Sequence, residues 1–200
     1  MICRQDIKPS NLLVSHSGVL KLADFGLARV HRGIGTAAGD RGSYTPQVAT
    51  RWFRAPELLF GARKYGVGVD LWAAGVVFGE MLTHSPLFPG ENDIDQIYRV
   101  MQVLGTPTPE VWPVRRDCTC CSGCVRFMTV QCVCRFQGAS SLPDFDKIQF
   151  PECKPLDLAE VVPNASPDAL ALLQKFLVYD PSKRISAAEV SCVCCGFARA

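Results

Sequence analysis

The stretch Arg4-Gln5-Asp6-Ile7-Lys8-Pro9-Ser10-Asn11, followed thirteen residues later by Asp24-Phe25-Gly26, decides the architecture. Short apolar runs at 12–14 and 19–24 surround the turn His16-Ser17-Gly18 between the two motifs, a pattern that predicts a β-hairpin. Asn11 and Asp24, which end the first motif and begin the second, carry the hard oxygen donors that suit Mg²⁺.

Downstream of a loop rich in Gly, Ser, Thr and Arg at 31–47, the pattern becomes helical. Val67 to Leu82 is apolar nearly all round, as expected of a helix buried in the centre of a domain. Apolar residues recur at helical spacing from Ile94 to Leu104, where Gly105-Thr106-Pro107 predicts the end of the helix. Two further helix starts are predicted at Ser166-Pro167-Asp168 and at the capping box Ser186-Ala187-Ala188-Glu189.

Composition is that of an ordinary globular protein, with 200 residues, 48% hydrophobic content and a net charge of +2. This charge is too near zero to favour nucleic acid or an acidic membrane surface as a partner. The first residues lack the apolar core of a signal peptide, and Asp70 and Glu80 interrupt the longest apolar stretch. We therefore expect a soluble intracellular protein with no nucleic-acid or membrane partner.

A third motif, Ala55-Pro56-Glu57, makes the pattern specific. The order and spacing of the three motifs resemble the catalytic loop, the metal-binding turn and the activation-segment end of protein kinases. The stretch Tyr44 to Glu57 is similar to the activation segment of the cyclin-dependent kinases, a family of Ser/Thr protein kinases. Three further stretches resemble one branch of that family: Ser85–Gly90, Leu104–Pro113 and Leu142–Phe150.

The resemblance implies an α+β fold, namely a protein-kinase-like C-terminal lobe that is mainly α-helical, with a short β-hairpin by the catalytic loop. The lobe would span 1–190. Its parts would be a catalytic loop at 4–11, a metal turn and activation segment at 24–57, and a helical subdomain at 58–190. Because the sequence holds neither a G-x-G-x-x-G motif after a strand nor a Val-Ala-x-Lys strand, we expect the N-terminal lobe to be absent.

The same resemblance implies the catalytic residues. Asp6 would orient the substrate hydroxyl and accept its proton, and Lys8 would neutralise charge on the transferring phosphoryl group. Asn11 and Asp24 would bind Mg²⁺, and together with Lys8 they would contact ATP. Thr50 would bond to both Asp6 and Lys8.

Regulation would involve the activation segment. Thr45 would be the phosphorylated residue, and Arg29 would pair with the phosphate. Arg54 would hold the carbonyl of Val48 away from the substrate, which favours proline after the phosphorylated residue because proline has no N–H to satisfy. Gln5 stands where the family has a second phosphate-binding arginine, so the phosphate would have fewer cationic partners here.

Three further residues would have structural roles. Glu57 and Arg184 would form a buried ion pair that ties the activation segment to the last helices. Asp70, together with Trp72, would brace the catalytic loop from the buried helix.

The implied function is a cyclin-dependent, proline-directed Ser/Thr protein kinase of the nucleus and cytoplasm. It would transfer the γ-phosphoryl group of ATP to protein substrates with Ser/Thr-Pro sites, using Mg²⁺ and a cyclin or cyclin-like activator. With the N-terminal lobe absent, we expect the chain alone to be largely inactive. The alternative is a catalytically silent C-terminal lobe that binds partners or competes with a complete kinase.

Two segments depart from the family pattern: a Cys-rich insertion at 114–141 and a tail at 191–200. The thiols of Cys121, Cys124, Cys132 and Cys134 could offer four ligands to zinc, which would make the insertion an interaction module. The other interpretation is that both segments derive from intron or out-of-frame sequence.

Overall fold

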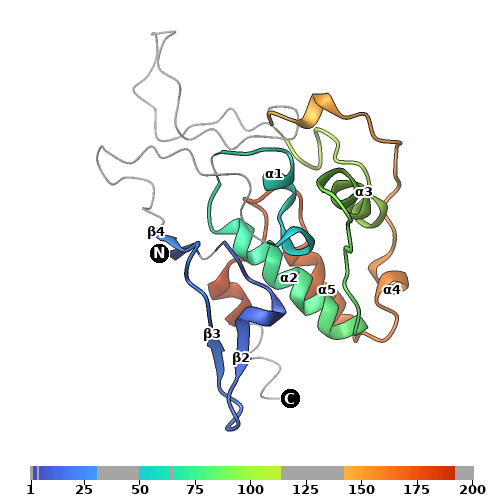
Figure 1. The fold of residues 1–200 in the computed structure, drawn as a ribbon. Coiled ribbons are helices and arrows are strands. Elements are labelled where there is room, and N and C mark those ends of the chain that lie inside the picture. Colours follow the sequence, from blue (N-terminus) through green and yellow to red (C-terminus); the bar gives the residue numbers. More distant parts are fainter. Residues whose placement is uncertain (1, 4, 31–49, 64, 114–141, 192–200) are drawn as a thin grey trace, which may run out of the picture.

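The computed structural model describes residues 2–3, 5–30, 50–63, 65–113 and 142–191 (Figure 1). The strands are β1 (Ile2–Cys3), β2 (Leu12–Val14), β3 (Leu20–Leu22) and β4 (Arg29–Val30). The α-helices are α1 (Pro56–Leu59), α2 (Gly68–Thr83), α3 (Asp93–Leu104), α4 (Leu158–Val161) and α5 (Pro167–Phe176). Short 3₁₀ helices occur at Pro9–Asn11, Arg51–Phe53 and Phe145–Lys147.

The predicted hairpin is confirmed as β2 and β3, which pair antiparallel with Leu12 opposite Leu22. Its turn places Gly18 at φ +78°, a left-handed conformation that favours glycine. The structure adds a pairing that we did not predict, between β1 and β4. Strands of two residues are too short to leave a recognisable alternation in the sequence.

Helix α2 lies at the centre of the helical part of the molecule (Figure 1). It was predicted from Val67 to Leu82 and is observed from Gly68 to Thr83. Trp72 on α2 is fully buried and stacks on Phe88. A Cβ built on Gly75 would collide with the side chain of Phe176, so this glycine allows the close approach of α5 to α2.

The predicted end of α3 at Gly105 and the predicted helix starts at Ser166 and Ser186 are also confirmed, whereas the cap of α3 was not predicted. The side chain of Asn92 caps α3 by accepting a hydrogen bond from the Asp95 N–H at 2.9 Å, and the helix ends at Gly105. The hydroxyl of Ser166 caps α5. Ser186 and Glu189 form the reciprocal pair of a capping box, with bonds of 2.7 and 3.2 Å, and residues 187–191 are helical.

The buried aromatic side chains join the distant parts of the helical region. Trp112 stacks on Tyr179, and Phe60 contacts Trp112 edge-on. The Tyr179 hydroxyl donates to the carbonyl of Gly105 at 2.7 Å. Burial raises the pKa of Tyr179, so its hydroxyl stays protonated and keeps this donor role at neutral pH.

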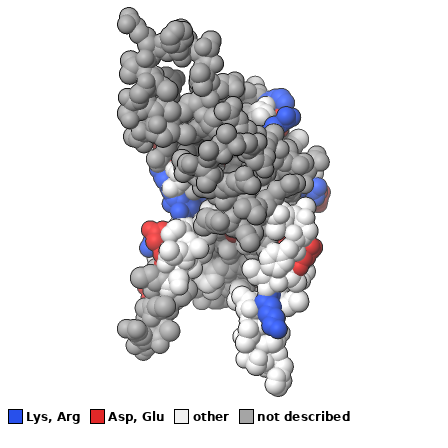
Figure 2. All heavy atoms as spheres, turned by 90° about the vertical axis from the view of Figure 1, so that its left-hand side faces the viewer, with Lys and Arg blue, Asp and Glu red and all other residues white. Residues whose placement is uncertain are grey.

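The hairpin projects from the helical part and exposes much of its apolar surface. The white atoms that project at the lower edge of the view in Figure 2 belong to it. The exposed apolar side chains of the two strands and their turn are Leu13, Val14, Val19, Leu20 and Leu22. Among the described helices, none is both long and apolar enough to cross a membrane.

Candidate active site

The backbone brings the first two motifs together. From β1 the chain passes through the loop at 5–11, runs out and back along the hairpin, and leaves through β4 (Figure 1). The Ala23 N–H donates to the carbonyl of Asn11 at 2.9 Å. Asp24, the next residue, therefore lies beside Asn11.

Asp6 is buried, and both of its carboxylate oxygens have partners. Oδ2 contacts Lys8 Nζ at 2.9 Å and Asn11 Nδ2 at 3.0 Å. Oδ1 faces Thr50, whose N–H and hydroxyl lie at 3.3 and 3.4 Å. Lys8 Nζ also donates to the Thr50 hydroxyl at 3.1 Å. The predicted contacts of Thr50 with Asp6 and Lys8 are thus present, and they join the catalytic loop to the end of the activation segment.

These partners decide the charge of Asp6. Burial alone would raise the pKa of its carboxyl group, but the hydrogen bond and charge of Lys8, with hydrogen bonds from Thr50 and Asn11, lower the pKa below its usual value. Asp6 is therefore an ionised carboxylate at neutral pH, fixed in orientation and able to accept a proton only transiently.

Asn11 and Asp24 offer oxygen atoms of the kind that Mg²⁺ prefers. The Asn11 amide nitrogen is engaged by Asp6, which leaves the amide oxygen at the other end of the group for a cation. Asp24 is exposed, has a left-handed backbone at φ +59°, and accepts the Gly26 N–H at 3.1 Å. This donor set fits a hydrated divalent cation.

Gln5 begins the described part of the catalytic loop in an unusual conformation. Its φ is +65°, and only 4% of the residue is exposed. Its N–H donates to Asp70 Oδ1 at 2.8 Å, the contact from the buried helix that we predicted for Asp70. Trp72 contacts Phe88 and Arg184, and its part in the predicted brace stays a prediction. A non-glycine residue in this region of φ is strained, and such strain gathers at functional sites.

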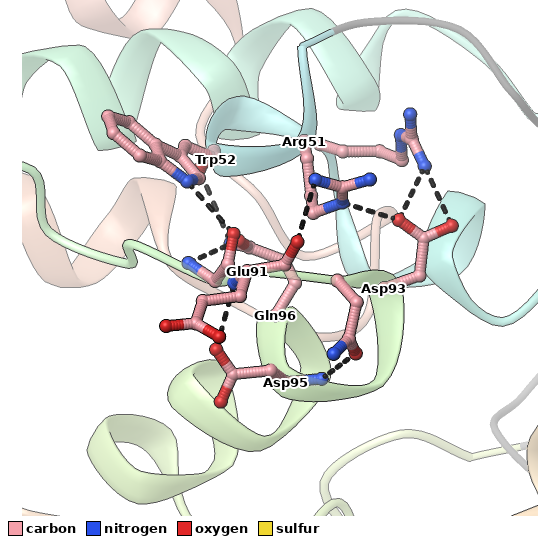
Figure 3. A network of polar contacts seen from close by, with 9 residues as sticks. Arg51, Trp52, Glu91, Asp93, Asp95 and Gln96 are labelled. Carbon is pink, nitrogen blue, oxygen red and sulfur yellow. Dashed lines mark hydrogen bonds and ion pairs between the residues drawn. The ribbon is translucent and has the colours of Figure 1, made fainter.

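A polar network fixes the end of the activation segment against α3 (Figure 3). Asp93, the first residue of α3, binds Arg51 Nε at 2.8 Å and Arg54 NH1 at 3.2 Å. The Trp52 indole donates to the carbonyl of Gly90 at 3.0 Å, and Gln96 accepts the Gly90 N–H at 3.0 Å.

Our reading of the sequence missed Asp93 and Gln96. Gln96 is completely buried and lies four residues before Val100, on the buried face of α3. A polar residue at a position whose spacing assigns it to the core was the available signal. Asp93 carried no comparable signal, because acidic residues are ordinary in the first turn of a helix.

Glu57 and Arg184 form the buried ion pair that we predicted. Two bonds of 2.7 Å join the guanidinium and carboxylate groups. Arg184 also donates to the carbonyls of Gly68, Val178 and Tyr179. The pair therefore links α1 to α2 and to the segment that follows α5.

Several predicted residues lie outside the described part of the chain. They include Thr45, Val48 and the four cysteines between 121 and 134, and the side chain of Arg29 is likewise not described. The 114–141 insertion and all but residue 191 of the 191–200 tail also lie there. Among the described residues no cluster of His, Cys, Asp and Glu could by itself hold a metal. The regulatory roles and the zinc site remain predictions.

The chain is similar to known proteins over nearly its whole length. A family described as protein kinase domain matches residues 1–193. Over 188 residues the chain is 51% identical to cyclin-dependent kinase 20 of Danio rerio, 51% to that of Mus musculus and 49% to that of Homo sapiens. Each alignment covers 94% of this chain and 46% of the relative, so the chain spans about half the length of these curated relatives. The predicted resemblance to the cyclin-dependent kinases is confirmed, including its branch, because the chain is about half identical to this kinase over 94% of its length.

The same match corrects the predicted fold class. We expected a C-terminal lobe with the N-terminal lobe absent, but the protein kinase domain matches from residue 1 to residue 193. The single-lobe description is therefore wrong. The prediction was wrong because it inferred the fold from motifs that the sequence lacks. Missing motifs do not determine how the residues that are present fold. We expected the chain to be largely inactive because this lobe would be missing, and that expectation no longer has a basis.

Proposed function

The chain belongs to the protein kinase family, and from this premise we propose that it carries the catalytic centre of a proline-directed Ser/Thr protein kinase. Such an enzyme transfers the γ-phosphoryl group of ATP to Ser or Thr residues of proteins. The observation that carries the proposal is the ionised, fully bonded Asp6 beside Lys8, Asn11 and Thr50. Phosphoryl transfer asks the protein mainly for positioning and charge compensation, which this cluster offers.

Asp6 and Lys8 would act on the two reacting groups. The substrate hydroxyl oxygen forms a bond to the γ-phosphorus, and the bond from that phosphorus to the bridging oxygen of ADP breaks. Asp6 orients the hydroxyl and accepts its proton, a role suited to a carboxylate held ionised by its neighbours. The Lys8 ammonium, 2.9 Å from Asp6, lies where negative charge on the transferring group needs compensation.

Asn11 and Asp24 would hold the metal. When bound, Mg²⁺ neutralises charge on the phosphates. Asn11 would have a second task, because its amide nitrogen holds the Asp6 carboxylate and its amide oxygen would be left to bind the cation. The two residues would thereby keep the base and the nucleotide in a fixed relation.

Specificity and regulation would come from the activation segment. The relatives are named as cyclin-dependent kinases, which supports a cyclin-like activator. By the resemblance of the stretch at 44–57 to that family, Thr45 would be the phosphorylated residue and proline would follow the substrate Ser or Thr. Arg54, whose guanidinium Asp93 binds, would supply the proline preference by holding the carbonyl of Val48 away from the substrate.

Phosphorylation of paired peptides tests the proposal. The chain, with Mg²⁺ and labelled ATP, should phosphorylate a Ser-Pro peptide in preference to the matched Ser-Ala peptide. Asp24→Ala should abolish transfer, whereas Asp168→Asn, an exposed acid in the first turn of α5, should not. Transfer that survives in Asp24→Ala would contradict the metal assignment. Peptide binding without transfer would favour the silent binding module instead.

A further inference from the structure

We propose that Asp93 is a positioning residue for phosphoryl transfer. It holds the end of the activation segment in the position from which Thr50 can donate its hydrogen bonds to Asp6. This inference rests on the proposed function. It concerns a residue of α3 that touches neither the catalytic loop nor the metal-binding turn in any described contact, and that acts through Arg51.

The Asp93 carboxylate binds two arginines, Arg51 and Arg54, which lie three residues apart in the chain. Its Oδ1 accepts Arg51 Nε at 2.8 Å, and both of its oxygens accept Arg54 NH1 at 3.2 Å. Arg51 is further fixed by its NH1, which donates to the carbonyl of Glu91 at 3.1 Å. Figure 3 shows Arg51 pointing toward Asp93 and Glu91 at the start of α3.

The segment so held begins at Thr50. The Thr50 N–H and hydroxyl reach Asp6 Oδ1 at 3.3 and 3.4 Å, near the long end of hydrogen-bond distances. A small shift of the backbone at Thr50 would therefore break both contacts. Because Arg51 is the adjacent residue, its anchorage to Asp93 restrains that shift directly.

Other contacts hold the remainder of the segment and separate the role of Asp93 from folding. Trp52 is tied to Gly90, and the Gln96 amide lies 3.5 Å from the Trp52 carbonyl, independently of Asp93. The side chains of Asp93 and Arg51 are 49% and 41% exposed, and an ion pair so exposed contributes little to global stability. Loss of Asp93 should therefore alter the register at Thr50 and Arg51 while the fold persists.

Hydrogen exchange and kinetics on three variants test this inference. In Asp93→Asn, amide exchange over residues 50–54 should accelerate by about three- to fivefold, the effect of losing an exposed ion pair. The apparent kcat for peptide phosphorylation should fall by a similar factor, with KM for ATP unchanged. Asp93→Glu should restore both. The control Asp168→Asn removes an equivalent first-turn charge from α5 and should change neither.

The hydrogen-exchange and kinetic measurements distinguish a failure of this inference from a failure of the proposed function. Exchange that stays at the unsubstituted rate in Asp93→Asn overturns the positioning role, whatever the activity. Accelerated exchange with unchanged kcat also overturns it, because the register would then not matter to transfer. If the unsubstituted chain transfers no phosphate, the proposed function fails, and a catalytic role for Asp93 fails with it even where exchange accelerates.

Discussion

The Glu57 carboxylate and the Arg184 guanidinium, 127 residues apart in the chain, meet through two bonds of 2.7 Å in a buried position. Arg184 is also 5.1 Å from the centre of the Trp72 ring. This pair thus fastens α1 to the central helix α2 and to the segment that follows α5.

Removing one partner should be strongly destabilising. Arg184→Met leaves the Glu57 carboxylate buried without its cation, which should lower the free energy of unfolding by about 3–5 kcal/mol. Lys147→Met is the matched control, because Lys147 forms an exposed pair with Asp144 and should cost under about 1 kcal/mol. Urea denaturation of the two variants measures both values, and similar losses would show that burial of the pair does not matter.

The titration of Asp6 should depend on Lys8. Lys8→Met removes a hydrogen bond and a positive charge that hold the Asp6 pKa low, so the pKa should rise. Because the folded pKa lies below the unfolded one, ionised Asp6 stabilises the fold above the unfolded pKa, and this contribution disappears as pH falls through the folded pKa. In Lys8→Met that contribution should be smaller, and its acid loss should occur at higher pH.

Carboxyl-carbon NMR of Asp6 measures this shift in the pKa directly. Lys21→Met serves as control, since Lys21 lies on strand β3 of the exposed hairpin. An unchanged Asp6 titration in Lys8→Met would refute the electrostatic account given above.

The contact between α2 and α5 should not tolerate a methyl group. In Gly75→Ala the new Cβ would overlap Phe176, and such overpacking typically costs about 1–3 kcal/mol. Gly18→Ala is the comparison, because a Cβ there would meet nothing within 4 Å and only the strain of positive φ would be felt. Thermal unfolding should show a larger loss for Gly75→Ala. The reverse order would mean that α5 moves away from α2 at little cost.

Local signals predicted most of the helical part of this structure. Periodicity and a capping side chain mark α3 and α5, whose first turns are capped by Asn92 and Ser166, whereas α2 has no capping side chain and was predicted from its continuous apolar run alone. The pairing of β1 with β4 could not be predicted, because it joins two-residue segments that are distant in the chain, with Ile2 opposite Val30 in the register.

The contacts of the candidate site were likewise predicted only in part. The contacts of Thr50 with Asp6 and Lys8, and of Glu57 with Arg184, followed from the resemblance to kinases and are present. The partnership of Asp93 with two arginines was missed, since it depends on where α3 packs and not on any pattern within α3. The error about the lobes arose from motifs not found in the chain, which do not determine how the residues present fold.

The most direct test of the central claim is the rate of phosphate transfer from Mg-ATP to a Ser-Pro peptide by the chain and by its Asp6→Asn variant. We predict measurable transfer that falls by at least about 100-fold in Asp6→Asn, the loss typical of removing a general base, with peptide affinity unchanged. The Asn side chain keeps one acceptor oxygen for the Thr50 N–H and hydroxyl, and Asn11 still donates to the backbone carbonyl of residue 6, so the fold of the loop should persist. Equal rates in the two proteins, or no transfer by either, would contradict the assignment of this site.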